Sequence, residues 1–157
     1  MPEPFGGRPV LAAVLCAAAV LAAAATGVIF QPGAWYAGLV KPPGTPPDWL
    51  FPVAWTTLYT LMAVAAWLVW RAAGPGGRGA LTLFGVQLAL NAVWTPVVFG
   101  AHALAAGLGV IVLLWLALAA TIRAFGELRP AAAWLLAPYL AWVTYAGYLN
   151  AGLLFFN

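Results

Sequence analysis

Long apolar stretches, separated by short segments that hold most of the charged residues, are the dominant pattern of this chain. No charged residue lies within Val10–Phe30 or within Trp49–Trp70. Each stretch is about as long as the roughly 20 residues that a helix needs to cross the hydrocarbon core of a bilayer. The pattern therefore predicts a membrane span in each of them.

Three further spans follow from the same reasoning. The next apolar interval is too long for one span, and it breaks naturally at 99–102, where the sequence is Phe-Gly-Ala-His. It is therefore divided into spans near Ala80–Gly100 and Ala103–Ala124, and a fifth span covers Ala131–Phe156.

The spans are predicted to be helices. Glycine and alanine are abundant, alternation of apolar and polar residues is absent, and lipid requires each backbone polar group to be satisfied within the protein. We therefore predict an all-α integral membrane protein with one transmembrane domain over residues 1–157. It is a five-helix bundle in which the loop 31–48 joins the first two spans.

Composition supports this prediction and excludes several classes of function. Hydrophobic residues make up 66% of the 157 residues and charged residues 6%, whereas a soluble domain has about 25% charged residues. Six Lys/Arg against three Asp/Glu give no basic patch, which argues against nucleic-acid binding. The single cysteine permits no internal disulfide and no cysteine-based metal site.

The basic residues predict an orientation. With five spans, one side of the membrane receives Arg8, Arg71, Arg78, Arg123 and Arg129. The other side receives only Lys41. Because basic residues accumulate in cytoplasmic loops, we expect a cytoplasmic N-terminus and an external C-terminus.

Groups that conventional catalysis needs are missing from the interior of the spans. The single histidine, His102, lies at a predicted turn, where a solvated role is favoured over that of a ligand or base. No nucleophile–base pair, phosphate loop or metal cluster can be assembled. We therefore expect no metal, no required cofactor, and neither hydrolysis nor phosphoryl transfer.

Aromatic and amide side chains recur at helical spacing in three spans. These stripes comprise Trp55, Tyr59 and Met62; Gln87, Asn91 and Trp94; and Tyr139, Trp142, Tyr145 and Leu149. One interpretation is that the two carboxamides join helices by hydrogen bonds. The other is that the stripes line a cavity suited to a flat, lipophilic, partly polar ligand.

Prolines and small residues leave further alternatives open. The segment Lys41–Trp49 contains four prolines and is either a lid over one end of the bundle or a rigid connector. Pro52, Pro96 and Pro138 lie within predicted spans and are expected to kink them. Gly85 and Ala89 form a small-xxx-small pair that serves either a homodimer or packing within one chain.

Taken together, the motifs resemble the translocator protein family, also called tryptophan-rich sensory proteins or peripheral benzodiazepine receptors. The resemblance extends over all five spans in order. It is carried by the segments Trp35–Pro42, Pro46–Trp49, Trp55–Tyr59, Gln87–Gly100 and Pro138–Trp142, and by Asn150.

The resemblance implies a five-helix bundle, often dimeric, that binds porphyrins such as protoporphyrin IX and benzodiazepine-like ligands beneath the first loop. Carried over position by position, the ligand-binding residues would be Ala25, Val28, Phe51, Ala54, Trp55, Asn91, Trp94, Leu113, Trp142, Ala146 and Leu149. The resemblance also favours the cell membrane of a bacterium.

Three functions are compatible with the resemblance. The first is a receptor or sensor that binds tetrapyrroles and influences their handling or signalling. The second is a transporter of porphyrin or another lipophile, and the third is an enzyme that degrades porphyrin in light with Trp55 and Trp142 as candidate catalytic residues. The cholesterol motif of animal members is incomplete, because no basic residue follows Asn150.

Overall fold

The computed structural model describes residues 9–157, and in this part of the chain the secondary structure is entirely helical. The glutamate Glu3 and the predicted orienting charge Arg8 lie outside the described residues. The elements are α1 (Pro9–Ile29), α2 (Ala34–Gly38), α3 (Leu50–Ala73), η1 (Gly74–Gly77), α4 (Arg78–Thr95), η2 (Pro96–Gly100), α5 (Leu104–Leu128) and α6 (Pro130–Phe156).

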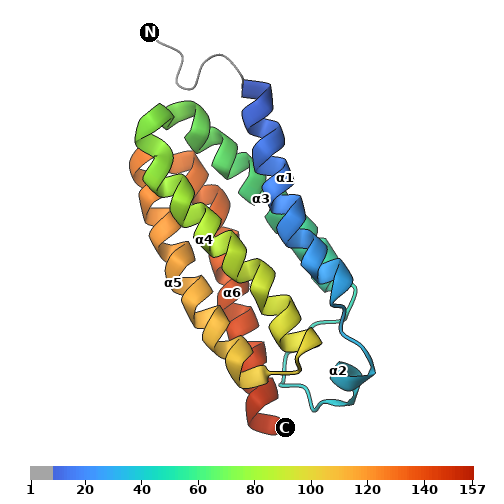
Figure 1. Cartoon of the computed structure of the whole chain (residues 1–157). Helices are drawn as coiled ribbons and strands as arrows, with labels where there is room; N and C mark the ends of the chain where they lie inside the picture. Colours follow the sequence, from blue (N-terminus) through green and yellow to red (C-terminus); the bar gives the residue numbers. More distant parts are fainter. Residues whose placement is uncertain (1–8) are drawn as a thin grey trace.

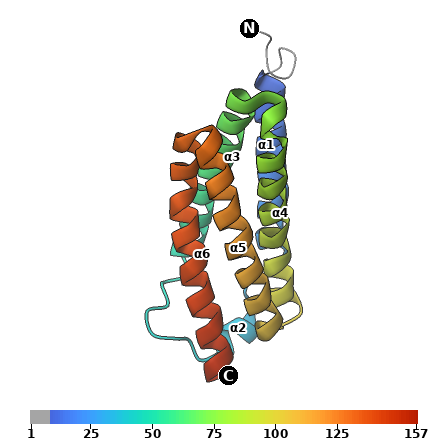
Figure 2. The same cartoon turned by 90° about the vertical axis from the view of Figure 1, so that its left-hand side faces the viewer.

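The five long helices form a closed ring (Figures 1 and 2). Helix α1 contacts α3 and α4, α3 contacts α6, α6 contacts α5, and α5 contacts α4. Each long helix begins and ends within four residues of a predicted span, when η2 is counted with α4. The short helix α2 was not expected; it lies at the same end of the bundle as the C-terminus (Figures 1 and 2), where its Trp35 and Tyr36 rings meet those of His102 and Phe99.

Four of these helical stretches are long and apolar enough to cross a membrane. They are Val10–Ile29, Leu50–Ala73, Arg78–Gly100 and Leu104–Leu128. Helix α6 has 27 residues, but its proline, tryptophan, tyrosine and asparagine residues make it less apolar than α5. The chain is therefore an integral membrane protein in which at least four of the described helices are apolar enough to span the membrane.

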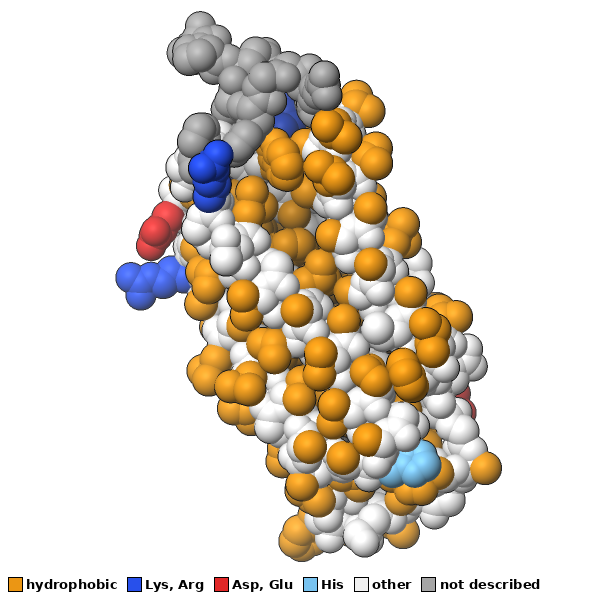
Figure 3. Space-filling model, viewed as in Figure 1, with side chains coloured by type: hydrophobic (Ala, Val, Ile, Leu, Met, Phe, Trp, Pro, Cys, Tyr) orange, Lys and Arg blue, Asp and Glu red, His pale blue; other side chains and the backbone are white. Residues whose placement is uncertain are grey.

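The surface agrees with this environment. Apolar side chains cover the visible face along the length of the helices, and charged side chains gather at the end near the start of α1 (Figure 3). That end carries Arg71, Arg78, Arg123 and Arg129, at the ends of α3, α4, α5 and α6. We call it the arginine end, and the opposite end, which carries α2 and residues 39–49, the loop end.

The proline predictions are corrected at one position. Pro52 is the third residue of α3. The first N–H groups of a helix have no acceptor within the helix, so a proline there removes no helical hydrogen bond and gives no reason for a kink. Pro138 lies inside α6 as predicted. Pro96 begins the π-helical turn η2, in which the N–H of Ala101 donates to the carbonyl of Pro96 at 2.9 Å.

Candidate ligand-binding site

Asn91 joins three helices of the ring at the centre of the bundle. Its side-chain oxygen accepts a hydrogen bond from the hydroxyl of Tyr59 on α3, and its side-chain nitrogen donates one to the hydroxyl oxygen of Tyr139 on α6, both at 2.8 Å. Asn91 is buried and Tyr139 fully so. Because a buried amide is costly without partners, these bonds fix the relative positions of α3, α4 and α6.

An aromatic cluster surrounds this network between α3 and α6. The ring of Trp55 stacks on Tyr59, with 5.3 Å between centroids, and meets Trp142 edge to face at 6.4 Å. Phe51, one turn earlier on α3, also meets Trp142 edge to face, with 6.0 Å between centroids. These distances lie in the range of favourable aromatic pairs, so the cluster presents several π faces beside a hydrogen-bonded amide.

A second amide, Asn150 of α6, connects the neighbouring helices closer to the loop end. Its side-chain oxygen accepts a hydrogen bond from Nε1 of Trp94 at 3.2 Å, and its side-chain nitrogen donates to the carbonyl of Leu104 at 2.8 Å. Gly107 of α5 lies against it, since a Cβ built there would be 3.0 Å from the Asn150 oxygen and 2.3 Å from Val98. Only glycine permits this approach.

Gln87 differs from the other interior amides. It lies one helical turn before Asn91 and is fully buried, yet neither its oxygen nor its nitrogen has a hydrogen-bond partner among the described residues. The sequence led us to expect both carboxamides of α4 to bridge helices or line a cavity. Asn91 makes the bridge, whereas Gln87 places an unpaired donor and acceptor in the apolar interior.

Residues 39–49 dock on α6 through specific contacts. The hydroxyls of Tyr145 and Tyr148 donate to the carbonyls of Gly44 and Pro43, the latter at 2.8 Å. Gly152 of α6 lies against the ring of Pro42, where an added Cβ would come within 2.5 Å. The loop therefore covers the loop end of α6 and lies next to the aromatic cluster.

The short helix α2 is attached by a lysine and by ring stacking. Nζ of Lys41 donates to the carbonyl of Tyr36 at 2.8 Å and lies 4.6 Å from the centre of its ring. Partial burial, together with the nearby charge of Asp48, raises the pKa of Tyr36 above its usual value, so this hydroxyl stays neutral at physiological pH. Trp35 stacks on His102 at 4.1 Å, which the sequence did not indicate.

The structure buries most of the predicted ligand-binding residues at least partly. Those on α3, α4 and α6 are buried or partly buried: Phe51, Ala54, Trp55, Asn91, Trp94, Trp142, Ala146 and Leu149. The remaining three, Ala25, Val28 and Leu113, are exposed, with exposed fractions of 70% for Val28 and 56% for Leu113. Leu113 lies on the outer face of α5, because Ile111 and Leu114 occupy the inner face.

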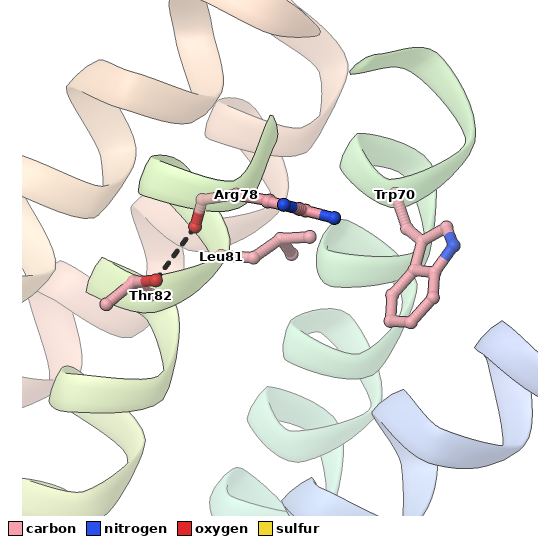
Figure 4. Close-up of a pocket in the computed structure, with 4 residues that line it drawn as sticks. All are labelled: Trp70, Arg78, Leu81 and Thr82. Atoms are coloured by element: carbon pink, nitrogen blue, oxygen red, sulfur yellow. Dashed lines mark hydrogen bonds between the residues drawn. The ribbon is translucent and has the colours of Figure 1, made fainter. Parts of the chain in front are cut away.

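Two hollows on the surface lie outside this set of residues. One, of about 560 Å³, is at the loop end and is lined by Trp35, Leu39, His102, Ala103, Leu104, Ala105, Ala106, Leu154 and Asn157. The other, of about 370 Å³, is at the arginine end and is lined by Trp70, Arg78, Leu81 and Thr82 (Figure 4).

The chemistry available at the aromatic cluster is stacking and neutral hydrogen bonding. Its polar groups are phenol hydroxyls, indole N–H groups and carboxamides. Within residues 9–157, no group of three His, Cys, Asp or Glu side chains is placed to hold a metal ion. The cluster is suited to a flat, largely apolar molecule with a few neutral or weakly polar edges.

Comparison with known proteins agrees with the sequence motifs. The profile of the TspO/MBR family matches residues 9–156. The protein CrtK of Rhodobacter capsulatus is 48% identical over 133 residues, which cover 82% of this chain and 81% of that protein. The tryptophan-rich sensory protein of Cereibacter sphaeroides is 47% identical over 85% of this chain and 83% of that protein. The human translocator protein is 42% identical over 74% of this chain and 70% of that protein.

Proposed function

Because the chain belongs to the TspO/MBR family of membrane sensory and translocator proteins, we propose that it is a membrane receptor for porphyrins. A tetrapyrrole such as protoporphyrin IX, or another flat lipophilic molecule, would bind among the aromatic side chains of α3 and α6. Binding would influence tetrapyrrole handling or signalling.

One observation carries this proposal: Trp55 and Trp142 meet beside the Tyr59–Asn91–Tyr139 network in the interior of the ring. Large aromatic rings are the natural partners of a planar macrocycle, and Asn91 offers a polar contact at its edge. Phe51 extends the same surface towards the loop end.

The docked loop would act as the lid of this site. Residues 39–49 are held on α6 by hydrogen bonds from Tyr145 and Tyr148 and by the contact between Pro42 and Gly152. These are few contacts at the surface of the bundle, so the loop can be released without disturbing the Asn91 network. A ligand would then enter between the loop ends of α3 and α6.

We also propose the arrangement in the membrane. Five spans, with α6 as the fifth, place the N-terminus in the cytoplasm of a bacterial cell and the C-terminus outside, because the arginine end carries most of the basic residues. The protein would form a homodimer through α4, whose Gly85 and Ala89 are exposed on the outer face of the ring. A Cβ at Gly85 would meet nothing within 4 Å, which leaves room for a second helix.

The proposal is tested by titrating the purified protein with protoporphyrin IX in the dark while tryptophan fluorescence is recorded. Saturable quenching is expected for the wild type. Trp55→Phe and Trp142→Phe should weaken binding by about 3- to 10-fold, because each removes part of the indole stacking surface.

Two exposed tryptophans supply matched controls. Trp115→Phe, on α5, and Trp134→Phe, near the start of α6, alter side chains with exposed fractions of 38% and 77%. Both are expected to bind as the wild type does. Quenching that rises linearly and is equal in all four variants would mean that porphyrin only partitions into detergent, and the receptor proposal would be abandoned.

A light-dependent degradation of the bound porphyrin is a second candidate, favoured by the 6.4 Å separation of the Trp55 and Trp142 rings. Two indoles in contact with one ligand could exchange electrons with its excited state in the presence of oxygen. Loss of porphyrin absorbance under illumination, retained in the control variants and abolished by Trp55→Phe or Trp142→Phe, distinguishes an enzyme from a receptor.

A further inference from the structure

We propose that the hollow at the arginine end binds the headgroup of an anionic phospholipid. This hollow lies between the end of α3 and the start of α4 (Figure 4). Both helices are apolar enough to span a membrane, so their ends fall in the headgroup layer. The inference does not depend on the proposed porphyrin site, which is in the interior of the ring.

Arg78 is the group that would meet the phosphate. Its side chain leaves the first turn of α4 and extends towards α3, with Leu81 below it in the view of Figure 4. Trp70, on α3, lines the hollow from the other helix. The hydroxyl of Thr82 donates to the backbone carbonyl of Arg78 at 2.9 Å and so is already engaged within its own helix. A guanidinium offers a planar set of donors that bind two phosphate oxygens at once.

The α3 side of the hollow is lined by the aromatic side chain of Trp70. Trp67, Trp70 and Arg71 lie at positions i, i+3 and i+4 of α3 and therefore share one face. The guanidinium of Arg71 lies over the ring of Trp67, 4.8 Å from its centre. Tryptophan rings favour the level of glycerol and headgroups in a bilayer, so this face suits the polar part of a lipid.

The charge balance at this end favours an anionic lipid over a zwitterionic one. Within the described residues, the arginine end carries four arginines and one acid, Glu127. Glu127 already pairs with Arg123 at 3.5 Å. Arg78, the arginine that lines the hollow, would therefore meet an anionic headgroup with no described carboxylate competing for it.

The surroundings favour a lipid over a soluble phosphate. The hollow opens at the end of helices whose outer faces are apolar (Figure 3), so acyl chains can continue along the protein from a headgroup held at Arg78. Leu81 and Trp70 would contact the first carbons of these chains. A free phosphate would gain nothing from this apolar floor.

The test is native mass spectrometry of the full-length protein in detergent, titrated with phosphatidylglycerol or phosphatidylcholine. The wild type is expected to hold phosphatidylglycerol more tightly than phosphatidylcholine. Arg78→Gln should weaken phosphatidylglycerol binding by about fivefold or more, because it removes the paired donors to the phosphate, with a smaller loss for phosphatidylcholine, whose phosphate is balanced by its own choline. Arg78→Lys, which keeps the charge but loses the planar donor set, should have a smaller effect.

Arg129→Gln is the matched control, because it removes one exposed charge from the same end but lies outside the hollow. It is expected to leave lipid preference within about twofold of the wild type, because an exposed charge outside the hollow makes no hydrogen bond to the bound headgroup and is screened by salt. Equal losses in Arg78→Gln and Arg129→Gln would show a diffuse charge effect and overturn the site. So would equal wild-type affinity for both lipids, or displacement of phosphatidylglycerol by millimolar inorganic phosphate, which would point to a soluble anion.

Discussion

From the centre of the bundle to the loop end, side chains on different helices are joined by hydrogen bonds, whereas towards the arginine end they are joined by apolar contacts. Asn91 and Asn150 connect α3, α4, α5 and α6 through phenol, indole and backbone groups. Towards the arginine end, Phe84 of α4 stacks on Phe125 of α5, with 5.8 Å between ring centroids. The first arrangement is directional, and the second depends mainly on shape and volume.

The boundary between these two regions lies at Gln87. This residue is separated by three positions from Phe84 and by four from Asn91, so all three share the inner face of α4. Its unpaired carboxamide shows that a polar side chain on the inner face does not by itself create a bond between helices. A bond forms only where a neighbouring helix presents a partner at the same level, as Tyr59 and Tyr139 do for Asn91.

The largest effect is expected from filling the space between α5 and η2. Gly107→Leu would force a side chain into Val98 and Asn150, because even a Cβ would lie 2.3 Å from Val98. We expect a loss of about 3 kcal/mol or more in the free energy of unfolding. Thermal unfolding in detergent measures the change.

Gly109 is the control for this substitution, since it lies on the same helix and a Cβ there would meet nothing within 4 Å. Gly109→Leu should unfold at or above the wild-type temperature, because leucine favours a helix more than glycine does. Equal destabilisation of both variants would mean that α5 does not approach η2 as closely as the structure has it.

The hydrogen-bonded region is tested by Asn91→Leu, which keeps the shape of the side chain but removes its polar atoms. The hydroxyls of Tyr59 and Tyr139 then lose their partner in a buried setting. We expect a loss of about 1–3 kcal/mol, measured by denaturant or thermal unfolding. Tyr59→Phe combined with Asn91→Leu should cost less than the sum of the two single changes, because both act on one bond.

The boundary is tested by Gln87→Met, which is expected to preserve or raise stability rather than lower it. Methionine has a similar length and no group that requires a hydrogen bond, so the variant should be as stable as the wild type or more stable by about 1 kcal/mol. The same unfolding assay applies. A clear destabilisation would show that Gln87 has a polar partner in the membrane-embedded protein, and would make it part of the Asn91 network.

The smallest effect is expected where the loop docks on α6. Tyr148→Phe removes the hydrogen bond to the carbonyl of Pro43 and should lower stability by about 0.5–1 kcal/mol. Faster amide hydrogen exchange in residues 39–49 with unchanged exchange in α3 is the expected signature. If α3 also exchanged faster, the loop would be an integral part of the bundle rather than a lid.

Much of the fold could be predicted from the chain, because the physical requirement is simple. A helix that crosses a bilayer needs about 20 apolar residues, and the few charges of this sequence mark the ends of such stretches. The short helix α2 escaped prediction because Ala34–Gly38 is too short to show helical periodicity and lies in a segment read as a loop.

The candidate site was predicted in part. Helical spacing predicted that Trp55 and Tyr59 share one face of their helix, and that Gln87 and Asn91 share one face of theirs. Such a prediction depends only on positions within a single helix. Spacing could not show that Asn91 has partners and Gln87 has none, because the partners belong to other helices. The resemblance supplied Leu113, which the structure places on the exposed face of α5.

The sequence by itself determined that this protein lies in a membrane and where its long helices begin and end. It also contained the family motifs. Apolar length and local spacing are properties of contiguous residues, so neither depends on how the helices pack. The tertiary structure alone decided the order of helices in the ring, the meeting of Trp55 with Trp142, and the docking of residues 39–49 on α6. It also placed Arg78 opposite Trp70 across a surface hollow. These features depend on the packing of helices against one another, where a shift of one turn would give every inner side chain a different partner.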